Sequence, residues 1–105
     1  PGQSLDFLRF SSDALLECCK NEARILRRIT PDKPITTNFM EWFKPADYRK
    51  WARELDFTCL DIYPEPTGPL RPLAQNADMT RSWKDGKPWL IMEQVTTHVN
   101  WRSRN

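Results

Sequence analysis

Four polar residues stand at the ends of short apolar runs, where their side chains could take part in chemistry: Asn38, Asp61, Tyr63 and Glu93. In α/β proteins the reacting groups lie where parallel strands end and loops begin. Glu93 is the leading candidate, because it directly follows Trp89–Met92 and a carboxylate there is costly to bury without partners. The alternative is that Glu93 only caps a loop or pairs with an arginine such as Arg102 or Arg104.

Three segments have the composition of the strands that would position these groups. Ile35–Phe39 is rich in β-branched residues, and Asn38 is expected at its C-terminal end. Phe57–Tyr63 stops at Pro64–Pro69, where three prolines forbid regular structure, so a loop must follow. Trp89–Met92 is uninterrupted in its apolar character, which is typical of a strand covered on both faces.

Helical patterns precede the first two strands. Ser11–Asp13 are capping residue types, and apolar residues then recur at spacings of three and four until Pro31 ends the helix near Thr30. Pro45 suits the first turn of a second helix, and the apolar side chains of Tyr48–Leu55 follow at helical spacing. Both segments are predicted to be amphipathic helices.

A third helix is expected over Leu73–Trp83, with Asp85-Gly86 as its stop signal. Alternation of helix and strand predicts parallel strands joined by crossover helices in an α/β architecture. Three such strands cannot close a barrel and would leave sheet edges exposed. The chain also starts without Met, and we expect it to be a piece of a longer protein.

Composition excludes several classes of function. The chain is 39% hydrophobic and 29% charged, with 16 basic and 14 acidic residues scattered along it, so neither nucleic acid nor a membrane surface is an expected partner. No apolar run approaches the roughly 20 residues of a membrane span. Cys18, Cys19 and Cys59 lack zinc-site spacing and are expected to be buried structural thiols. His98 is the single histidine, and no metal or cofactor site is predicted.

Several motifs in order resemble those of glycoside hydrolase family 42 β-galactosidases. They are Leu5–Asp13, Ile35–Met40, Phe43–Pro45, Asp47-Tyr48, Pro88–Gln94, Val99–Arg102 and Asn105. Each motif is weak alone, but their number and order make a chance likeness improbable. The likeness covers nearly the entire chain.

This resemblance implies that residues 1–105 are one fragment of a catalytic (β/α)₈ TIM-barrel domain, with the fifth, sixth and seventh parallel strands and their helices. It implies retaining hydrolysis of terminal β-D-galactosides, with Glu93 as the nucleophile. The family's acid/base Glu follows Asn after the fourth strand. The one Asn-Glu pair here, Asn21-Glu22, lies in the first predicted helix, so the isolated fragment is predicted to be inactive.

The resemblance also implies two substrate-binding roles. Trp101 would cover the apolar face of galactose, although it could instead be a core tryptophan. Tyr63 would hydrogen-bond the nucleophile and hold it ionised, or it could pack under the loop that begins at Pro64. Asn38 could touch sugar or satisfy a turn. Ile62 stands where the family often has a polar residue, which puts the role of Asp61 in doubt.

The expected partner is a galactoside substrate, and the family implies a homotrimer of the full-length enzyme. The sequence does not establish a cellular location, and a cytoplasmic one is the expectation. Two alternatives remain open: a retaining glycosidase of the same clan with another sugar preference, and a non-catalytic carbohydrate-binding or scaffold domain. The second would use Trp83, Trp89 and Trp101 as stacking platforms.

Overall fold

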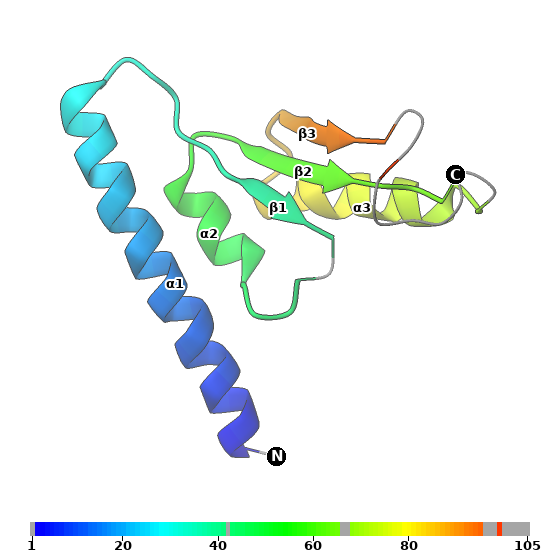
Figure 1. Cartoon of the computed structure of the whole chain (residues 1–105), viewed down its shortest axis with the longest axis horizontal. Helices are drawn as coiled ribbons and strands as arrows, with labels where there is room; N and C mark the ends of the chain where they lie inside the picture. Colours follow the sequence, from blue (N-terminus) through cyan, green and yellow to red (C-terminus); the bar gives the residue numbers. More distant parts are fainter. Residues whose placement is uncertain (1, 42, 66–67, 96–98, 100–105) are drawn as a thin grey trace.

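A computed structural model describes residues 2–41, 43–65, 68–95 and 99 of the chain. Helices and strands alternate along it, as Figure 1 shows. The elements are α1 (Gly2–Ile29), β1 (Asn38–Met40), α2 (Tyr48–Glu54), β2 (Thr58–Ile62), α3 (Arg71–Trp83) and β3 (Trp89–Gln94). The predicted order of helix, strand, helix, strand, helix, strand is confirmed.

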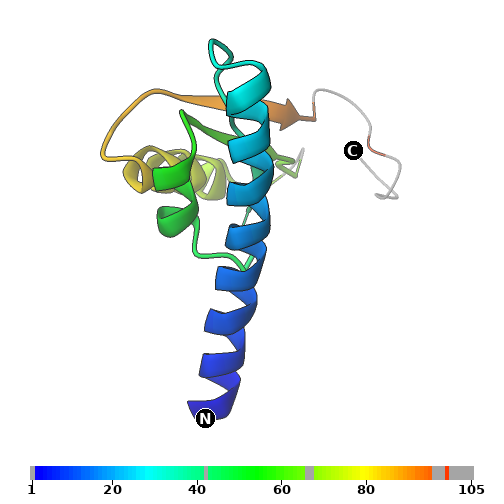
Figure 2. The ribbon, with the colours of Figure 1, turned by 90° about the vertical axis from the view of Figure 1, so that its left-hand side faces the viewer.

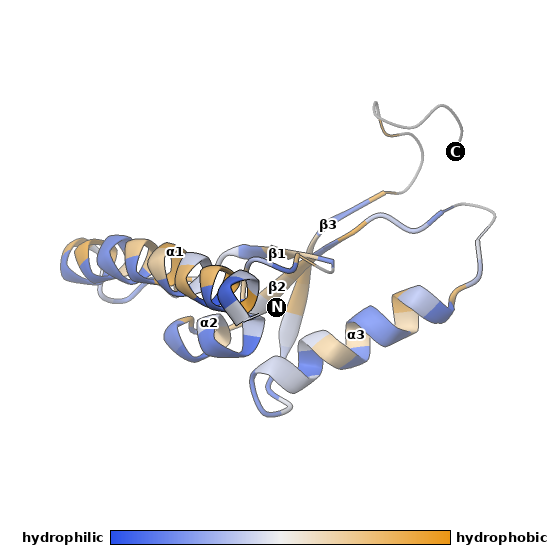
Figure 3. Ribbon diagram, turned by 90° about the horizontal axis from the view of Figure 1, so that it is seen from below, coloured by the Kyte–Doolittle hydropathy of each residue, from blue (hydrophilic) through white to orange (hydrophobic). Residues whose placement is uncertain are grey.

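The strands form one parallel sheet in the order β1-β2-β3, so β2 is central. α2 connects β1 to β2, and α3 connects β2 to β3. Both crossover helices lie on the same side of the sheet, which is clearest from below (Figure 3). The predicted α/β class with parallel strands is therefore confirmed.

The core lies between the sheet and these two helices. Phe39, Leu55, Leu60 and Ile62 form its buried centre, each no more than 3% exposed. Aromatic rings from α2 and α3 surround Phe39: Tyr48 stacks on it, and Trp51 and Trp83 meet it edge-on. The amphipathic helix predicted from the apolar side chains of Tyr48–Leu55 is thus confirmed, and these side chains pack against the core. These contacts fix the position of β1 and β2 relative to α2 and α3.

The predicted start of the first helix is wrong, because α1 begins at Gly2 and passes through Ser11–Asp13 without a break. No proline or internal glycine interrupts residues 3–29, so helical hydrogen bonding continues. Ser12 is buried and accepts a hydrogen bond from the backbone N–H of Asp47, while Asp13 pairs with Lys50. Ser12 and Asp13 therefore link α1 to the start of α2 and do not cap a helix.

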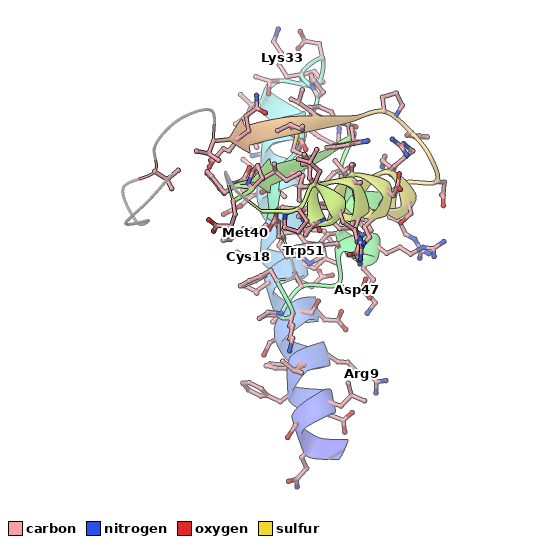
Figure 4. The ribbon with its side chains drawn as sticks, turned by 90° about the vertical axis from the view of Figure 1, so that its right-hand side faces the viewer. Arg9, Cys18, Lys33, Met40, Asp47 and Trp51 are labelled. Atoms are coloured by element: carbon pink, nitrogen blue, oxygen red, sulfur yellow. The ribbon has the colours of Figure 1, made fainter. Side chains whose placement is uncertain are left out.

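The N-terminal turns of α1 extend well past the sheet (Figure 2). Arg9 lies on this projecting part, whereas Cys18 lies further along the helix (Figure 4). Phe7 and Phe10 are 67% and 70% exposed within this chain. The predicted end of the helix is confirmed, since α1 stops at Ile29, two residues before Pro31.

Two further boundaries differ from the sequence prediction. β1 begins at Asn38, so Asn38 opens the strand instead of closing it. The residues before Asn38 make other hydrogen bonds than those of a β-ladder. The Ile35 N–H donates to the Asp56 carboxylate, and the Ile35 carbonyl accepts from the Asp56 N–H. The Thr36 hydroxyl donates to the Phe57 carbonyl. Pro45 was expected in the first turn of the second helix, but α2 begins later, at Tyr48. Asp47 caps it, and its side chain accepts a hydrogen bond from the Lys50 N–H.

The expectation that Trp89–Met92 is covered on both faces is wrong for this chain. Leu90, Ile91 and Met92 are 39–51% exposed, because β3 is an edge strand whose one neighbour among the described strands is β2. The expectation of three buried thiols holds for Cys59 alone of the three, because Cys18 is exposed and Cys19 is half-buried on α1. α3 ends as predicted, with positive φ angles of 52° at Asp85 and 77° at Gly86.

Asp56 joins the end of α1 to the loops before β1 and β2. Its carboxylate accepts from both terminal nitrogens of Arg27, at 3.2 and 3.1 Å, and from the Ile35 N–H at 2.6 Å. The backbone bond from Ile35, together with Arg27, holds the pKa of Asp56 below its ordinary value. Because the folded pKa is lowered, the stabilisation is present above the unfolded pKa of about 4 and disappears as pH falls through the folded value.

We therefore expect Asp56→Asn to lower the free energy of unfolding of the chain at pH 6 by at most about 1 kcal/mol, since the side chain is 37% exposed and solvent screens the pair. The difference should shrink as pH falls below about 4 and vanish once pH lies below the lowered folded pKa of Asp56. Urea unfolding at a series of pH values measures it. Asp32→Asn is the matched control, because its ion pair with Lys33 is long and exposed. A deficit that stays constant down to pH 2 would refute the electrostatic origin.

The described helices α1, α2 and α3 lack the combination of length and apolar character that a membrane-spanning segment needs.

Candidate active site

The candidate residues gather at the carboxyl end of the sheet, on the face opposite the helices. Side chains alternate between faces along a strand, so Leu60 and Ile62 face the core while Cys59 and Asp61 face away from it. Asn38 pairs in register with Cys59 and therefore shares the Asp61 face. We call this the open face of the sheet.

A bulge in β3 places Glu93 on that face. Ile91 pairs with Leu60, and the next pair is Glu93 with Asp61, so Met92 is an extra residue without a partner in the register. Regular alternation from Trp89 and Ile91 would have turned Glu93 toward the helices. The shift by one residue instead puts two carboxyl groups, Asp61 and Glu93, side by side on neighbouring strands.

Tyr63, one residue past β2, donates its hydroxyl hydrogen bond to Oε2 of Glu93. This contact, together with burial and the charges of Glu93 and Asp61, raises the pKa of Tyr63 to about 12. The phenol therefore remains a proton donor throughout the neutral range. The contact predicted between Tyr63 and Glu93 is present in the structure. The arginines considered as alternative partners of Glu93, Arg102 and Arg104, lie outside the described residues.

Asn38 and Asp61 form a second pair beside the first. The Asn38 side-chain amide donates to Oδ2 of Asp61 at 2.6 Å, and Asp61 is only 6% exposed. Burial raises the pKa of Asp61, the hydrogen bond from Asn38 opposes this, and the charge of Glu93 adds to it. The sequence pointed to both residues individually but did not predict their contact.

A cavity of about 260 Å³ opens next to Tyr63 at the same end of the sheet. Its lining comes from the loops that follow β1 and β2 and from the first turn of α3, and it includes two carboxylates, Glu41 and Glu65. Neither glutamate was selected from the sequence. Glu41 directly follows the last residue of β1, and Glu65 lies two residues after Tyr63, so position next to a strand end was the signal that could have found them. A separate hollow of about 340 Å³ lies between α2 and α3. Its lining includes Trp83, one of the tryptophans considered as a stacking platform, but none of Asn38, Asp61, Tyr63 and Glu93.

Several residues considered from sequence lie outside the described residues, among them His98, Trp101, Arg102 and Arg104. In the described ranges, no three His, Cys, Asp or Glu side chains converge as a metal site would require. The groups that do converge are one carboxylate bound by a phenol and one buried carboxyl group bound by an amide. This arrangement can offer an oriented carboxylate at the carboxyl end of a parallel sheet.

Comparison with known proteins identifies the family. A sequence model of the family described as β-galactosidase, glycoside hydrolase family 42, matches residues 1–105. The chain belongs to glycoside hydrolase family 42. The β-galactosidase bgaB of Geobacillus kaustophilus is 46% identical over 107 residues, which cover 100% of this chain and 16% of that relative. The chain thus spans about one sixth of the length of this family 42 relative.

Solved structures of family 42 enzymes have the same arrangement. The β-galactosidase of Bacillus circulans sp. alkalophilus superimposes with a TM-score of 0.89 at 44% identity, over 97% of this chain and 15% of that one. A catalytic mutant of the β-galactosidase Gan42B from G. stearothermophilus, in which a glutamate is replaced by alanine, gives 0.83 at 33% identity, over 94% and 16%. These neighbours are TIM-barrel β-galactosidases.

Proposed function

We propose that this chain supplies the nucleophile side of the active site of a retaining β-galactosidase, with Glu93 as the nucleophile. The observation that carries the proposal is the Tyr63–Glu93 hydrogen bond on the open face of a parallel sheet. A phenol that donates to one carboxylate oxygen favours the ionised form and leaves the second oxygen for attack. Membership of family 42 supports a galactoside as the substrate.

In the proposed reaction, an oxygen of Glu93 forms an ester bond to the anomeric carbon as the glycosidic bond breaks. A protonated carboxyl group on the other side of that bond, roughly 5–5.5 Å from Glu93, gives its proton to the leaving oxygen. The same group then removes a proton from water, which breaks the ester and releases galactose with its configuration retained.

The rest of the barrel would supply the second carboxyl group. We propose that β1, β2 and β3 are the fifth, sixth and seventh strands of the barrel, and that the acid/base Glu follows the fourth strand, outside residues 1–105. Trp101 would cover the sugar. A homotrimer of the full-length enzyme remains a proposal from the family resemblance, as does a cytoplasmic location.

A chimera tests the proposed role in a complete barrel. Residues 1–105 would replace the corresponding stretch of bgaB from G. kaustophilus, to which they are 46% identical; we call this protein the bgaB chimera. We expect it to hydrolyse an aryl β-galactoside, and we expect the isolated 105-residue chain to show no turnover, because protonation of the leaving group typically contributes about 10²–10⁴-fold.

Formation of the covalent ester can be detected by trapping it with 2-deoxy-2-fluoro-β-D-galactosyl fluoride. Attack by the nucleophile expels fluoride and leaves the fluorosugar as an ester, and peptide mass spectrometry should locate it on Glu93. A label on any other carboxylate would disprove the assignment of Glu93. Sugar binding by the chimera with neither turnover nor label would favour a carbohydrate-binding domain, and efficient turnover of another glycoside instead would favour a different clan member.

A further inference from the structure

A cavity of about 260 Å³ lies beside Tyr63, the residue that donates a hydrogen bond to Glu93. The same tyrosine lines the cavity and contacts the proposed nucleophile, so the cavity is one side chain away from the reacting group. Sites for drug-sized ligands typically have volumes of about 300–1,000 Å³. A cavity slightly below that range is large enough for a single ring.

The walls of this cavity combine apolar surface with acidic groups. Proline rings and Leu73 supply the apolar part, and Glu41 and Glu65 supply two carboxylates. Small-molecule pockets usually have this composition, with a few polar groups that orient the ligand on apolar walls. The described lining contains no lysine, arginine or histidine. Tyr63, with a pKa of about 12, is neutral near pH 7, so the charged groups of the lining are negative.

The backbone that carries each carboxylate is held by local contacts. The Gly68 N–H donates to the Glu65 carbonyl at 3.0 Å, and a Cβ at Gly68 would lie only 3.0 Å from the Glu65 Cβ. Glu41 directly follows Met40, whose carbonyl accepts from the Tyr48 hydroxyl at 2.6 Å. Positions that are fixed before a ligand arrives lower the entropic cost of binding it.

The cavity also lies on the side of the site where a leaving group would depart. In the proposed barrel, β1 is the fifth strand and the acid/base Glu follows the fourth, so Glu41 lies next to the strand that carries the proton donor. That donor gives its proton to the leaving oxygen. Glu93 lies on β3, with β2 between it and β1. A leaving group protonated from the fourth strand would therefore extend toward Glu41.

We propose that this cavity receives the aglycone of the galactoside, and that Glu41 and Glu65 are specificity-determining residues that favour an aglycone carrying a protonated amine. This inference deepens the proposed function and rests on it. The carboxylates attract an ammonium group and accept its hydrogen bonds, while the apolar walls contact the ring that carries it. Cleavage of the glycosidic bond still belongs to Glu93 and the acid/base group.

Two aryl galactosides and the bgaB chimera test the inference. The β-D-galactosides of tyramine and of 4-ethylphenol have leaving groups of similar size and acidity, but only tyramine carries an ammonium group. The measurement is the ratio of their kcat/KM values, tyramine over 4-ethylphenol, at pH 7 and low ionic strength. Because both glutamates are exposed, we expect the double variant Glu41→Gln/Glu65→Gln to lower this ratio by about fivefold. Glu17→Gln, on the exposed surface of α1, should leave it unchanged.

Salt provides a second measurement. Raising the ionic strength to about 1 M should bring the ratio of the unsubstituted chimera toward that of the double variant, because salt screens exposed charges. A ratio that does not change in the double variant would overturn the inference while leaving Glu93 as the labelled nucleophile. Equal losses of kcat/KM for both galactosides would overturn it as well, because the glutamates would then act regardless of aglycone charge. Failure of the unsubstituted chimera to label on Glu93 would instead reject the proposed function itself.

Discussion

Glu93→Gln in the bgaB chimera is expected to lower kcat for an aryl β-galactoside by roughly 10⁴-fold or more. Glutamine preserves the shape of the side chain and an oxygen for Tyr63, but the neutral amide is a poor nucleophile. Substrate affinity should change far less than kcat, because the lost interaction forms as the anomeric carbon reacts. Steady-state kinetics measure both. Glu17→Gln, the same chemical change on the exposed surface of α1, is the matched control.

Glu93→Ala extends this test to stereochemistry. The smaller side chain leaves room for azide, which can attack the anomeric carbon as the leaving group departs. Attack by azide on that side should restore part of the rate and yield galactosyl azide of the opposite anomeric configuration, identifiable by NMR. Retained activity in Glu93→Gln, or rescue that gives the starting configuration, is incompatible with Glu93 as the nucleophile.

Leu60→Ala carries the largest expected loss of stability. Leu60 is 1% exposed on the central strand and belongs to the buried cluster with Phe39, Leu55 and Ile62. Removing three carbon atoms there leaves a cavity between the sheet and its helices. We expect the free energy of unfolding of the chain to fall by about 2–5 kcal/mol. Urea unfolding followed by tryptophan fluorescence measures the change.

Leu70→Ala is the matched control for Leu60→Ala. The same atoms are removed from a side chain that is 74% exposed just before α3. We expect a change of less than about 0.5 kcal/mol. Equal losses in the two variants would mean that the cluster around Leu60 is not the stabilising core of this chain.

The order and type of the elements could be predicted from sequence, because local patterns are strong here. Helical spacing from Tyr48 to Leu55 and the stop at Asp85-Gly86 are both present in the structure. Boundaries were less accurate where a tertiary contact competes with a local signal. Ser12 is a residue type typical of helix caps, yet it lies inside the unbroken helix α1. Its hydroxyl accepts a hydrogen bond from the N–H of Asp47, 35 residues away.

Some features of the candidate site could likewise be predicted from sequence, and others depended on tertiary structure. An acidic residue directly after the apolar run Trp89–Met92 is visible in the sequence, although β3 itself extends to Gln94 and contains Glu93. A tyrosine before a proline-rich loop is visible as well. The hydrogen bond between Tyr63 and Glu93 was expected from family resemblance, and the structure contains it. The contact between Asn38 and Asp61 was not predicted, because it depends on the register of β1 against β2, which local patterns do not encode.

The sequence by itself determined the alternation of helices and strands, the family, and the choice of Glu93. Each of these depends on residue type and spacing along the chain. Only the tertiary structure decided which face Glu93 occupies. Counting residues from Trp89 would place it against the helices, and the bulge at Met92 reverses this by shifting the register against β2. Pairing between strands sets that shift, so the carboxylate reaches Tyr63 and Asp61 only once the sheet has formed.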